Sequence, residues 1–221
     1  MRRAAGLLTC GEGDGDVSVR LAATVAGAPV SVAEVDAAEA RLRSGASGAA
    51  LPASGTSEGR QLRRWLTQVL VTERVVAAEA AARGLTTRDA PTEAELLPDE
   101  TARLELGGVA AAVLADPRAR ALFVDVTAQV EVGDDDVADY HARNPLRFAA
   151  PRQGRHGWRV PPPVGPPLED VRPAIADHLR GAARRRAFRV WLDARRAALV
   201  RLAPGYEHPG DPRQPDNTHR H

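Results

Sequence analysis

Apolar residues recur every three or four positions over residues 168–202, which is the spacing of one side of an α-helix. This stripe consists of Val171, Ile175, Leu179, Ala182, Trp191, Ala198 and Leu202. Many arginines lie between them, and Gly181 lies near the middle. The pattern predicts one long amphipathic helix. Such a helix needs an apolar partner surface, which the earlier part of the chain must supply.

A second stripe predicts a helix over residues 58–83. Its apolar positions are Leu62, Trp65, Leu66, Val69, Leu70, Val76 and Ala80. We expect Ser57 to cap this helix and Gly84 to end it, because glycine readily adopts the left-handed conformation found after many helices. Upstream, residues 22–30 predict two short extended segments about a turn at Gly27.

Capping signals mark the shorter helices. Ser31 and Glu34 form a capping box for a helix that continues to about Arg43. Thr92 and Glu95 repeat this pattern, and Pro98 is expected to open a further helix that Gly107-Gly108 weakens. Asp116-Pro117 predicts a short helix to about Phe123. A helix that starts at Asp134 or Asp135 is expected to end at Asn144-Pro145.

The remaining segments predict extended or irregular structure. Residues 126–132 (VTAQVEV) alternate apolar and polar side chains, which favours a strand. Residues 44–56 are rich in Gly, Ala, Ser and Pro, which is typical of a flexible linker. We expect a disordered N-terminus over 1–20, a Pro/Gly connector over 151–164 and a proline-rich tail over 203–221. Residues 21–150 and 165–202 are expected to form one discontinuous helical domain.

Composition supports a mostly α fold with a short N-terminal β-hairpin and a long C-terminal helix. The 221 residues are 43% hydrophobic but only 4% aromatic, so Ala, Val and Leu supply the core. The net charge is +1, and all 30 basic residues are arginines, as expected from a GC-rich genome. The arginine clusters of the long helix are therefore interpreted as a salt-bridged face, with the acidic segments 92–105 and 134–139 as partners. Without interleaved aromatic residues, they do not predict nucleic-acid binding.

The N-terminus leaves two cellular locations open. Cys10 is the single cysteine, so no internal disulfide is possible. Arg2-Arg3 and Cys10 resemble an export signal, but the apolar run between them is too short for one. We expect a cytoplasmic protein without a membrane span, with export as the alternative.

Three motifs appear in a familiar order: ATVAGAPVSVAEVDA at 23–37, VEVGDDDVADYHARNPLRF at 130–148, and the segment 168–200. Together they resemble the chaperone module of the SurA/PrsA-type peptidyl-prolyl isomerases, which is related to the C-terminal module of trigger factor. The resemblance implies that N-terminal helices and a returning C-terminal helix fold together and hold unfolded polypeptides.

The segment at the position where that family carries its catalytic domain differs in this sequence. A parvulin isomerase domain, which the family inserts before the last helix, needs on the order of a hundred residues. Only residues 151–167 are available here, and the island His156–Val160 resembles a closing strand of such a domain. The resemblance therefore implies polypeptide binding without a complete isomerase, and no catalytic residue or cofactor is predicted. Residual isomerase activity at the island remains an alternative.

Other candidate chemistry has a structural explanation beside the functional one. His208, His219 and His221 are potential metal ligands, but they lie in a tail whose composition is typical of solvated turns. Asp134-Asp135-Asp136 is explained by the helix dipole, which favours carboxylates at a helix N-terminus. Tyr140 and His141 are adjacent on their helix and should point in different directions.

The sequence therefore favours a helical chaperone or accessory factor that binds extended, apolar polypeptide segments beside the long helix. The residues expected to line the core or this groove are Trp65, Val69, Tyr140, Phe148, Phe188 and Trp191. A dedicated partner protein of one biosynthetic enzyme, acting through the arginine face and the tail, is a further alternative.

Overall fold

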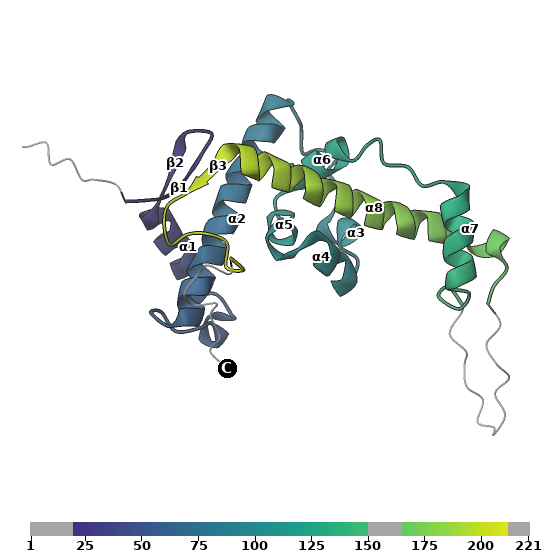
Figure 1. Ribbon diagram of the computed structural model, residues 1–221, viewed down its shortest axis with the longest axis horizontal. Helices are drawn as coiled ribbons and strands as arrows, with labels where there is room; N and C mark the ends of the chain where they lie inside the picture. Colours follow the sequence, from purple (N-terminus) through teal and green to yellow (C-terminus); the bar gives the residue numbers. More distant parts are fainter. Residues whose placement is uncertain (1–19, 150–164, 212–221) are drawn as a thin grey trace, which may run out of the picture.

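The computed structural model describes residues 20–149 and 165–211 (Figure 1). In this part of the chain, helices predominate and a small antiparallel sheet lies at one end. The expected mostly α fold with a long C-terminal helix is therefore confirmed. Predictions for the N-terminus, the island His156–Val160 and the final histidines His219 and His221 fall outside the described residues.

The sheet has three strands in the order β2-β1-β3: β1 (Leu21–Val25), β2 (Ala28–Ser31) and β3 (Val200–Leu202). The predicted hairpin is β1-β2, which turns at Ala26-Gly27, both with positive φ. The predicted extension of the long helix to Leu202 is wrong. The chain becomes extended at Val200 because the free edge of β1 can pair with it, Ala23 opposite Leu202 and Val25 opposite Val200.

The capping box of Ser31 and Glu34 is confirmed at the start of α1 (Val32–Ser44), with the Glu34 N–H donating to Ser31 Oγ at 3.2 Å. The following segment is not structureless as predicted. It contains a 3₁₀ turn, η1 (Gly48–Ala50), packed so closely that a Cβ on Gly48 would lie 1.8 Å from the Arg43 carbonyl oxygen. Helix α2 (Ser57–Ala82) is capped by Thr56 rather than Ser57, since Thr56 Oγ1 accepts from the Gly59 N–H.

Four short helices lie between α2 and the long helix: α3 (Glu93–Leu96), α4 (Glu100–Leu106), α5 (Gly108–Val113) and α6 (Pro117–Val126). The second capping box is confirmed at Thr92 and Glu95. Asp99, not Pro98, caps α4. Gly107 has φ 91° and separates α4 from α5, as the paired glycines suggested.

The strand predicted over 126–132 is absent from the structure. Val126 is the last residue of α6, residues 127–129 form a turn, and residues 130–133 have no regular structure. Thr127 is buried and its hydroxyl donates to the Phe123 carbonyl at 2.6 Å, which satisfies the end of α6. This capping contact, rather than strand pairing, determines the local conformation.

Helix α7 (Asp134–Arg143) lies against the first turns of α8 (Leu168–Leu199), which then crosses the molecule to reach the sheet (Figure 1). Val171 and Ile175 of the predicted stripe are buried, but Ala198 is exposed. In the second half of α8, the buried side chains are Arg185, Phe188 and Leu192.

Helix α8 therefore contributes to two apolar clusters. The main core gathers side chains from the sheet, α2, the short helices and the second half of α8, among them Val30, Val71, Val75, Leu106, Leu114, Leu122, Phe123, Phe188 and Leu192. The outer cluster is smaller and joins α7 to the start of α8 through Val137, Val171 and Ile175, with Tyr140, Phe148, Leu168 and Leu179 partly buried around them.

Candidate functional site

Helix α2 buries polar side chains and leaves part of its apolar stripe half-exposed. Thr67, Gln68 and Thr72 are each at most 1% exposed, whereas Trp65, Val69 and Leu70 are only half-buried. This reverses the usual preference, because burial of apolar surface is favourable and burial of polar groups is not. The apolar edge is the most informative departure from an ordinary core helix.

The buried polar groups are tolerated because they are hydrogen-bonded. Thr67 and Thr72 donate to the carbonyls of Arg63 and Gln68, at 2.9 and 2.6 Å. Gln68 donates to the Tyr206 carbonyl at 3.1 Å and accepts from the Arg196 guanidinium. Satisfied polar groups can be buried at little net cost. The hydrogen bond from Gln68 also fixes the start of the C-terminal tail on α2.

The half-exposed edge of α2 and one side of α1 enclose a groove of about 370 Å³. We call it the α1–α2 groove, and its lining residues are Ala38, Arg41, Leu42, Trp65, Leu66, Val69, Leu70 and Glu73. Trp65 and Val69 were predicted from the α2 stripe. Arg41, Leu42 and Glu73 were missed, although the spacing of Ala38 and Leu42 on α1 was a usable signal.

Trp65 gives the groove both apolar surface and a polar group. Its ring is half-buried, and a Cβ on Gly108 of α5 would lie 3.9 Å from the indole Nε1. Among the described residues, no acceptor lies within hydrogen-bond distance of this N–H. A tryptophan in such a position can pack against an apolar ligand while its N–H binds a carbonyl.

Two charged side chains, Arg41 and Glu73, also line the groove. Arg41 and Glu73 are exposed, and within the described part of the chain neither forms an ion pair. Partial burial of the Glu73 carboxyl is the largest cause that raises its pKa, and repulsion from Asp116 is the second. Arg41 opposes this shift. The groove thus combines apolar lining residues with one cation and one anion.

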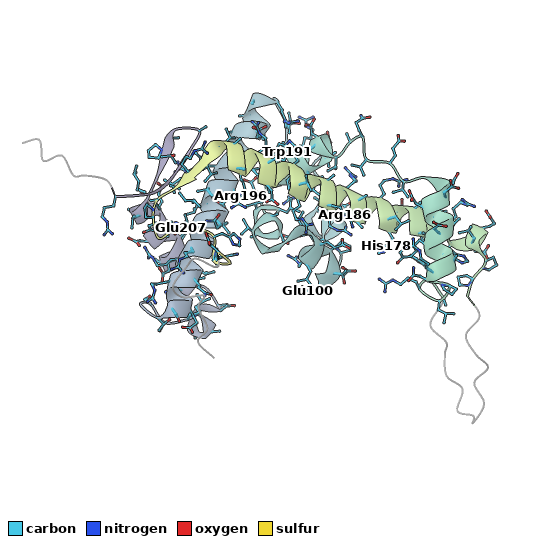
Figure 2. The ribbon with its side chains drawn as sticks, in the orientation of Figure 1. Glu100, His178, Arg186, Trp191, Arg196 and Glu207 are labelled. Atoms are coloured by element: carbon cyan, nitrogen blue, oxygen red, sulfur yellow. The ribbon has the colours of Figure 1, made fainter. Side chains whose placement is uncertain are left out.

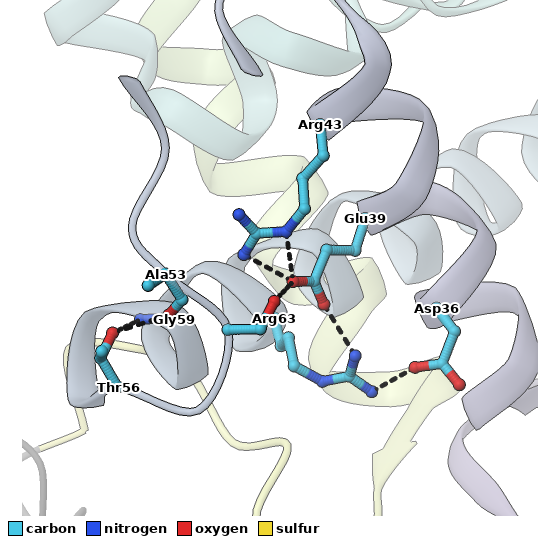
Figure 3. Close-up of polar contacts among 8 residues, drawn as sticks. Asp36, Glu39, Arg43, Ala53, Thr56, Gly59 and Arg63 are labelled. Carbon is cyan, nitrogen blue, oxygen red and sulfur yellow. Dashed lines mark hydrogen bonds and ion pairs between the residues drawn. The ribbon is translucent and has the colours of Figure 1, made fainter. Parts of the chain in front are cut away.

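Charged side chains around the buried Glu39 connect α1 to α2 (Figure 3). Glu39 of α1 accepts hydrogen bonds from Arg43 Nε at 2.8 Å, Arg63 at 2.7 Å and Ser54 Oγ at 3.2 Å. Arg63 of α2 also donates to Asp36 at 2.6 Å. Although burial raises the pKa of Glu39, the hydrogen bonds from Arg43, Arg63 and Ser54 outweigh it and lower that pKa. This cluster fixes the helix pair that forms the groove.

The other predicted residues lie elsewhere. Phe188 is fully buried in the main core, with its ring 5.1 Å from Phe123 and 5.8 Å from Trp191, centroid to centroid. Tyr140 and Phe148 belong to the outer cluster, where both rings contact His178, a residue labelled on α8 in Figure 2. The six predicted residues therefore form three separate groups, and only Trp65 and Val69 line the groove.

The adjacent Tyr140 and His141 do point apart as expected. The Tyr140 hydroxyl lies 3.2 Å from His178 Nε2, while His141 Nε2 lies 2.9 Å from the Pro166 carbonyl oxygen. The acidic run also has its structural explanation, because Asp136 accepts from the Gly133 N–H and Asp134 pairs with Arg172.

Most arginines of α8 are engaged within the molecule, as the sequence predicts. Arg185 pairs with Glu105 at 2.8 Å, and Arg195 Nε donates to Glu79 at 2.8 Å. The acidic partner Glu79 on α2 was not foreseen. Arg186 is exposed and has no ion pair among the described residues (Figure 2). These contacts account for much of the basic face without a phosphate ligand.

Metal and membrane features are absent from the described residues. Within 20–149 and 165–211, no cluster of three or more His, Cys, Asp or Glu side chains could hold a metal ion. His208 Nδ1 instead accepts from the Gly210 N–H at 3.0 Å. None of the helices in these ranges combines the length and the apolar character that crossing a bilayer requires.

Comparison with known proteins gives one match. A model described as a family of unknown function, DUF7158, matches residues 21–58. The matched segment contains the β1-β2 hairpin, α1 with one side of the groove, and Glu39 with its partner Ser54. No curated protein and no solved structure matches the chain.

Proposed function

We propose that this protein is a polypeptide-binding chaperone or accessory factor that holds extended, apolar segments in the α1–α2 groove. The observation that carries the proposal is the half-exposed apolar edge of α2, where Trp65, Val69 and Leu70 stay accessible while Thr67, Gln68 and Thr72 are buried. An apolar surface that a fold leaves open beside satisfied polar groups is typical of a binding site.

The groove suits an unfolded segment better than a rigid ligand. Apolar side chains of a client would bury against Val69, Leu70 and the Trp65 ring, which releases about 25 cal/mol for each Å² of apolar surface removed from water. The indole N–H of Trp65 would donate to a main-chain carbonyl of the client. Since every polypeptide carries such carbonyls, this contact favours binding without selecting a sequence.

The resemblance to the SurA/PrsA-type chaperone module supports the same proposal. The resemblance leads us to expect N-terminal helices and a returning C-terminal helix that fold together, and α8 does return to the N-terminal sheet, although strand β3 beside β1 was not expected. The resemblance concerns the order of the elements, and the groove supplies the surface that binds.

An aggregation assay tests the proposal. A chemically unfolded client is diluted into buffer with the full-length protein in stoichiometric excess, and light scattering follows its aggregation. We expect suppression by the wild-type chain, and a weaker effect of Val69→Ser, which removes apolar surface from the groove. The matched control is Val190→Ser on α8, because Val190 is 61% exposed and lies outside the groove.

The expected loss for Val69→Ser is about fivefold in apparent affinity, since one half-buried valine contributes about 1 kcal/mol. Trp65→Phe, which keeps a ring but removes the N–H, should have a smaller effect. Circular dichroism must show that both variants remain folded. A wild-type protein that protects none of several unrelated clients, or a Val190→Ser variant as defective as Val69→Ser, would overturn the proposal.

A further inference from the structure

A second cavity lies away from the α1–α2 groove, where α8 passes over α3 and α6. Its volume is about 230 Å³, and its lining residues are Glu95, Leu96, Phe123, Asp177, Arg180, Gly181, Arg184 and Arg185. Three arginines and two carboxylates are among the residues that line it. The proposed polypeptide-binding function does not use this cavity.

Gly181 has a packing reason to occupy the middle of α8. Glycine in a helix interior costs about 1 kcal/mol relative to alanine, so a glycine at this place calls for an explanation. A Cβ on Gly181 would lie 3.1 Å from an Arg185 guanidinium nitrogen, which is closer than most side-chain carbons approach. The glycine therefore leaves room for the Arg185 guanidinium at the wall of the cavity.

Each carboxylate around the cavity already has a partner. Asp177 accepts from Arg180 at 2.7 Å, and Glu95 accepts from the Thr92 N–H and hydroxyl at 2.6 and 2.8 Å. Arg185, which is itself buried, pairs with Glu105 just outside the cavity and also donates to the Leu96 carbonyl at 3.3 Å. Arg180 and Arg185 are thus each paired with an acid, which leaves the third arginine of the lining.

Arg184 is that third arginine, and it is held in place without a counter-charge. Its Nε donates to Thr127 Oγ1 at 2.8 Å, and its Cζ lies 5.5 Å from the centroid of the Phe123 ring. Within the described ranges, no carboxylate lies within ion-pair distance of Arg184. Burial, followed by repulsion from Arg180, lowers the pKa of its guanidinium. Partial desolvation without a counterion is costly, and an anionic ligand would relieve that cost.

We infer that this cavity binds the carboxylate of a small organic acid, with Arg184 as the charge partner and Phe123 and Leu96 beside the apolar part of the ligand. A planar guanidinium fixed through Nε can present its two terminal nitrogens to a carboxylate as a bidentate pair. One guanidinium without an acidic partner, with the Glu95 carboxylate also on the cavity wall, suits a monoanion better than a phosphate dianion. The volume is below the range of about 300–1,000 Å³ for drug-sized ligands, which limits the ligand to a few heavy atoms or one terminal residue.

A carboxylate of this kind could come from a free acid or from the C-terminus of a polypeptide. Isothermal titration calorimetry of the full-length protein distinguishes these sources with 4-methylpentanoate as the free acid and N-acetyl-leucine as the terminal residue. N-acetyl-leucinamide has the same shape without the charge, and inorganic phosphate tests the choice of anion. We expect binding of at least one acid, with the amide and phosphate each at least tenfold weaker.

Variants on α8 locate the site. Arg184→Gln should weaken binding of the acid about tenfold or more, because a charge-assisted bidentate contact is lost. Gly181→Ala should weaken it less, by displacing Arg185. The matched control is Arg186→Gln, which removes the same charge two positions further along the helix at an exposed residue outside the cavity, and should bind as wild type does.

The wild-type titrations decide the matter even if Arg184→Gln fails to fold. Equal affinity for the acid and its amide, tighter binding of phosphate than of both acids, or no binding of either acid at millimolar concentration would each overturn the inference. Equal loss in Arg184→Gln and Arg186→Gln would also overturn it. Because the aggregation assay uses the α1–α2 groove, failure of the one site leaves the result for the other intact.

Discussion

The main core and the outer cluster are both built on α8, but they are held together in different ways. In the main core, Phe188 is surrounded by Phe123, Trp191 and side chains from α2, the sheet and the short helices. In the outer cluster, α7 packs against the first turns of α8, and three buried residues join them. Aromatic contacts with His178 and ion pairs such as Arg172–Asp134 supplement them.

Helix α8 is continuous, yet it belongs to two regions that we expect to differ in stability. Local opening free energies are lowest where few apolar contacts are buried, so α7 should open more readily than the main core. The groove and the Arg184 cavity both belong to the better-packed region. We therefore expect an opening of α7 to leave most of the lining of both in place.

The largest expected effect comes from a substitution in the main core. Phe188→Ala should lower the free energy of unfolding by about 3–5 kcal/mol, because it removes a fully buried ring and leaves a cavity between Phe123 and Trp191. Thermal and urea denaturation followed by circular dichroism measure the change. Val190→Ala, on the same helix but exposed, should stay within about 0.5 kcal/mol. A loss below about 1 kcal/mol for Phe188→Ala would show that this ring does not anchor the core.

A second substitution should break the outer cluster alone. Ile175→Ala removes the most deeply buried side chain there, at an expected local cost of about 2–3 kcal/mol. Hydrogen exchange should accelerate in α7 while α2 and the second half of α8 keep their protection. If the amides of α2 exchange faster by the same factor as those of α7, then the two regions unfold together and the distinction made above is wrong.

Acid should lower the free energy of unfolding by protonating Glu39, which connects α1 to α2. Its pKa is lowered in the folded state, so its contribution is present above its ordinary value near 4.5 and is lost as the pH falls through the lower folded value. Glu39→Gln should cost about 2 kcal/mol at pH 7, where Arg43 and Arg63 lose a charged partner. The difference between variant and wild type, from urea denaturation at pH 7, 5 and 3.5, should shrink with falling pH. A constant difference would contradict this role of the carboxylate.

The smallest expected effect comes from a substitution in the outer cluster. Tyr140→Phe keeps the ring contacts with Phe148 and His178 but removes the hydroxyl, which lies 3.2 Å from His178 Nε2. One half-exposed hydrogen bond contributes about 0.5–1.5 kcal/mol, and this should appear as faster hydrogen exchange in α7 alone. A Tyr140→Phe protein as perturbed as Ile175→Ala would mean that the hydroxyl, rather than the apolar contacts, holds α7.

Part of the candidate groove could be predicted and part could not. The stripe on α2 identifies Trp65 and Val69, because helical periodicity places them on one side of the helix. It does not reveal that α2 buries Thr67, Gln68 and Thr72 instead. The burial of Gln68 depends on hydrogen bonds to Tyr206 and Arg196, more than a hundred residues away in sequence. Likewise, the stripe cannot show whether Phe188 faces the core or a groove.

The sequence by itself determined the features that depend on neighbours within about four residues. The capping boxes at Ser31 and Thr92 and the start of α6 after Asp116 were predicted correctly, because each is a contact between side chain and backbone inside one turn. Gly107-Gly108 was predicted to weaken a helix, and the structure shows a full break at Gly107, whose backbone conformation glycine readily tolerates.

Only the tertiary structure decided the features that depend on distant partners. Residues 126–132 alternate like a strand, but they pair with no strand of the described sheet, and Thr127 ends α6 instead. Val200–Leu202 continue a helical stripe, yet β1 offers its free edge and they become β3. Periodicity records which side of a segment is apolar. Strand pairing and ion pairing depend on what the rest of the chain places beside that segment, and so does the lack of an acidic partner for Arg184 among the described residues.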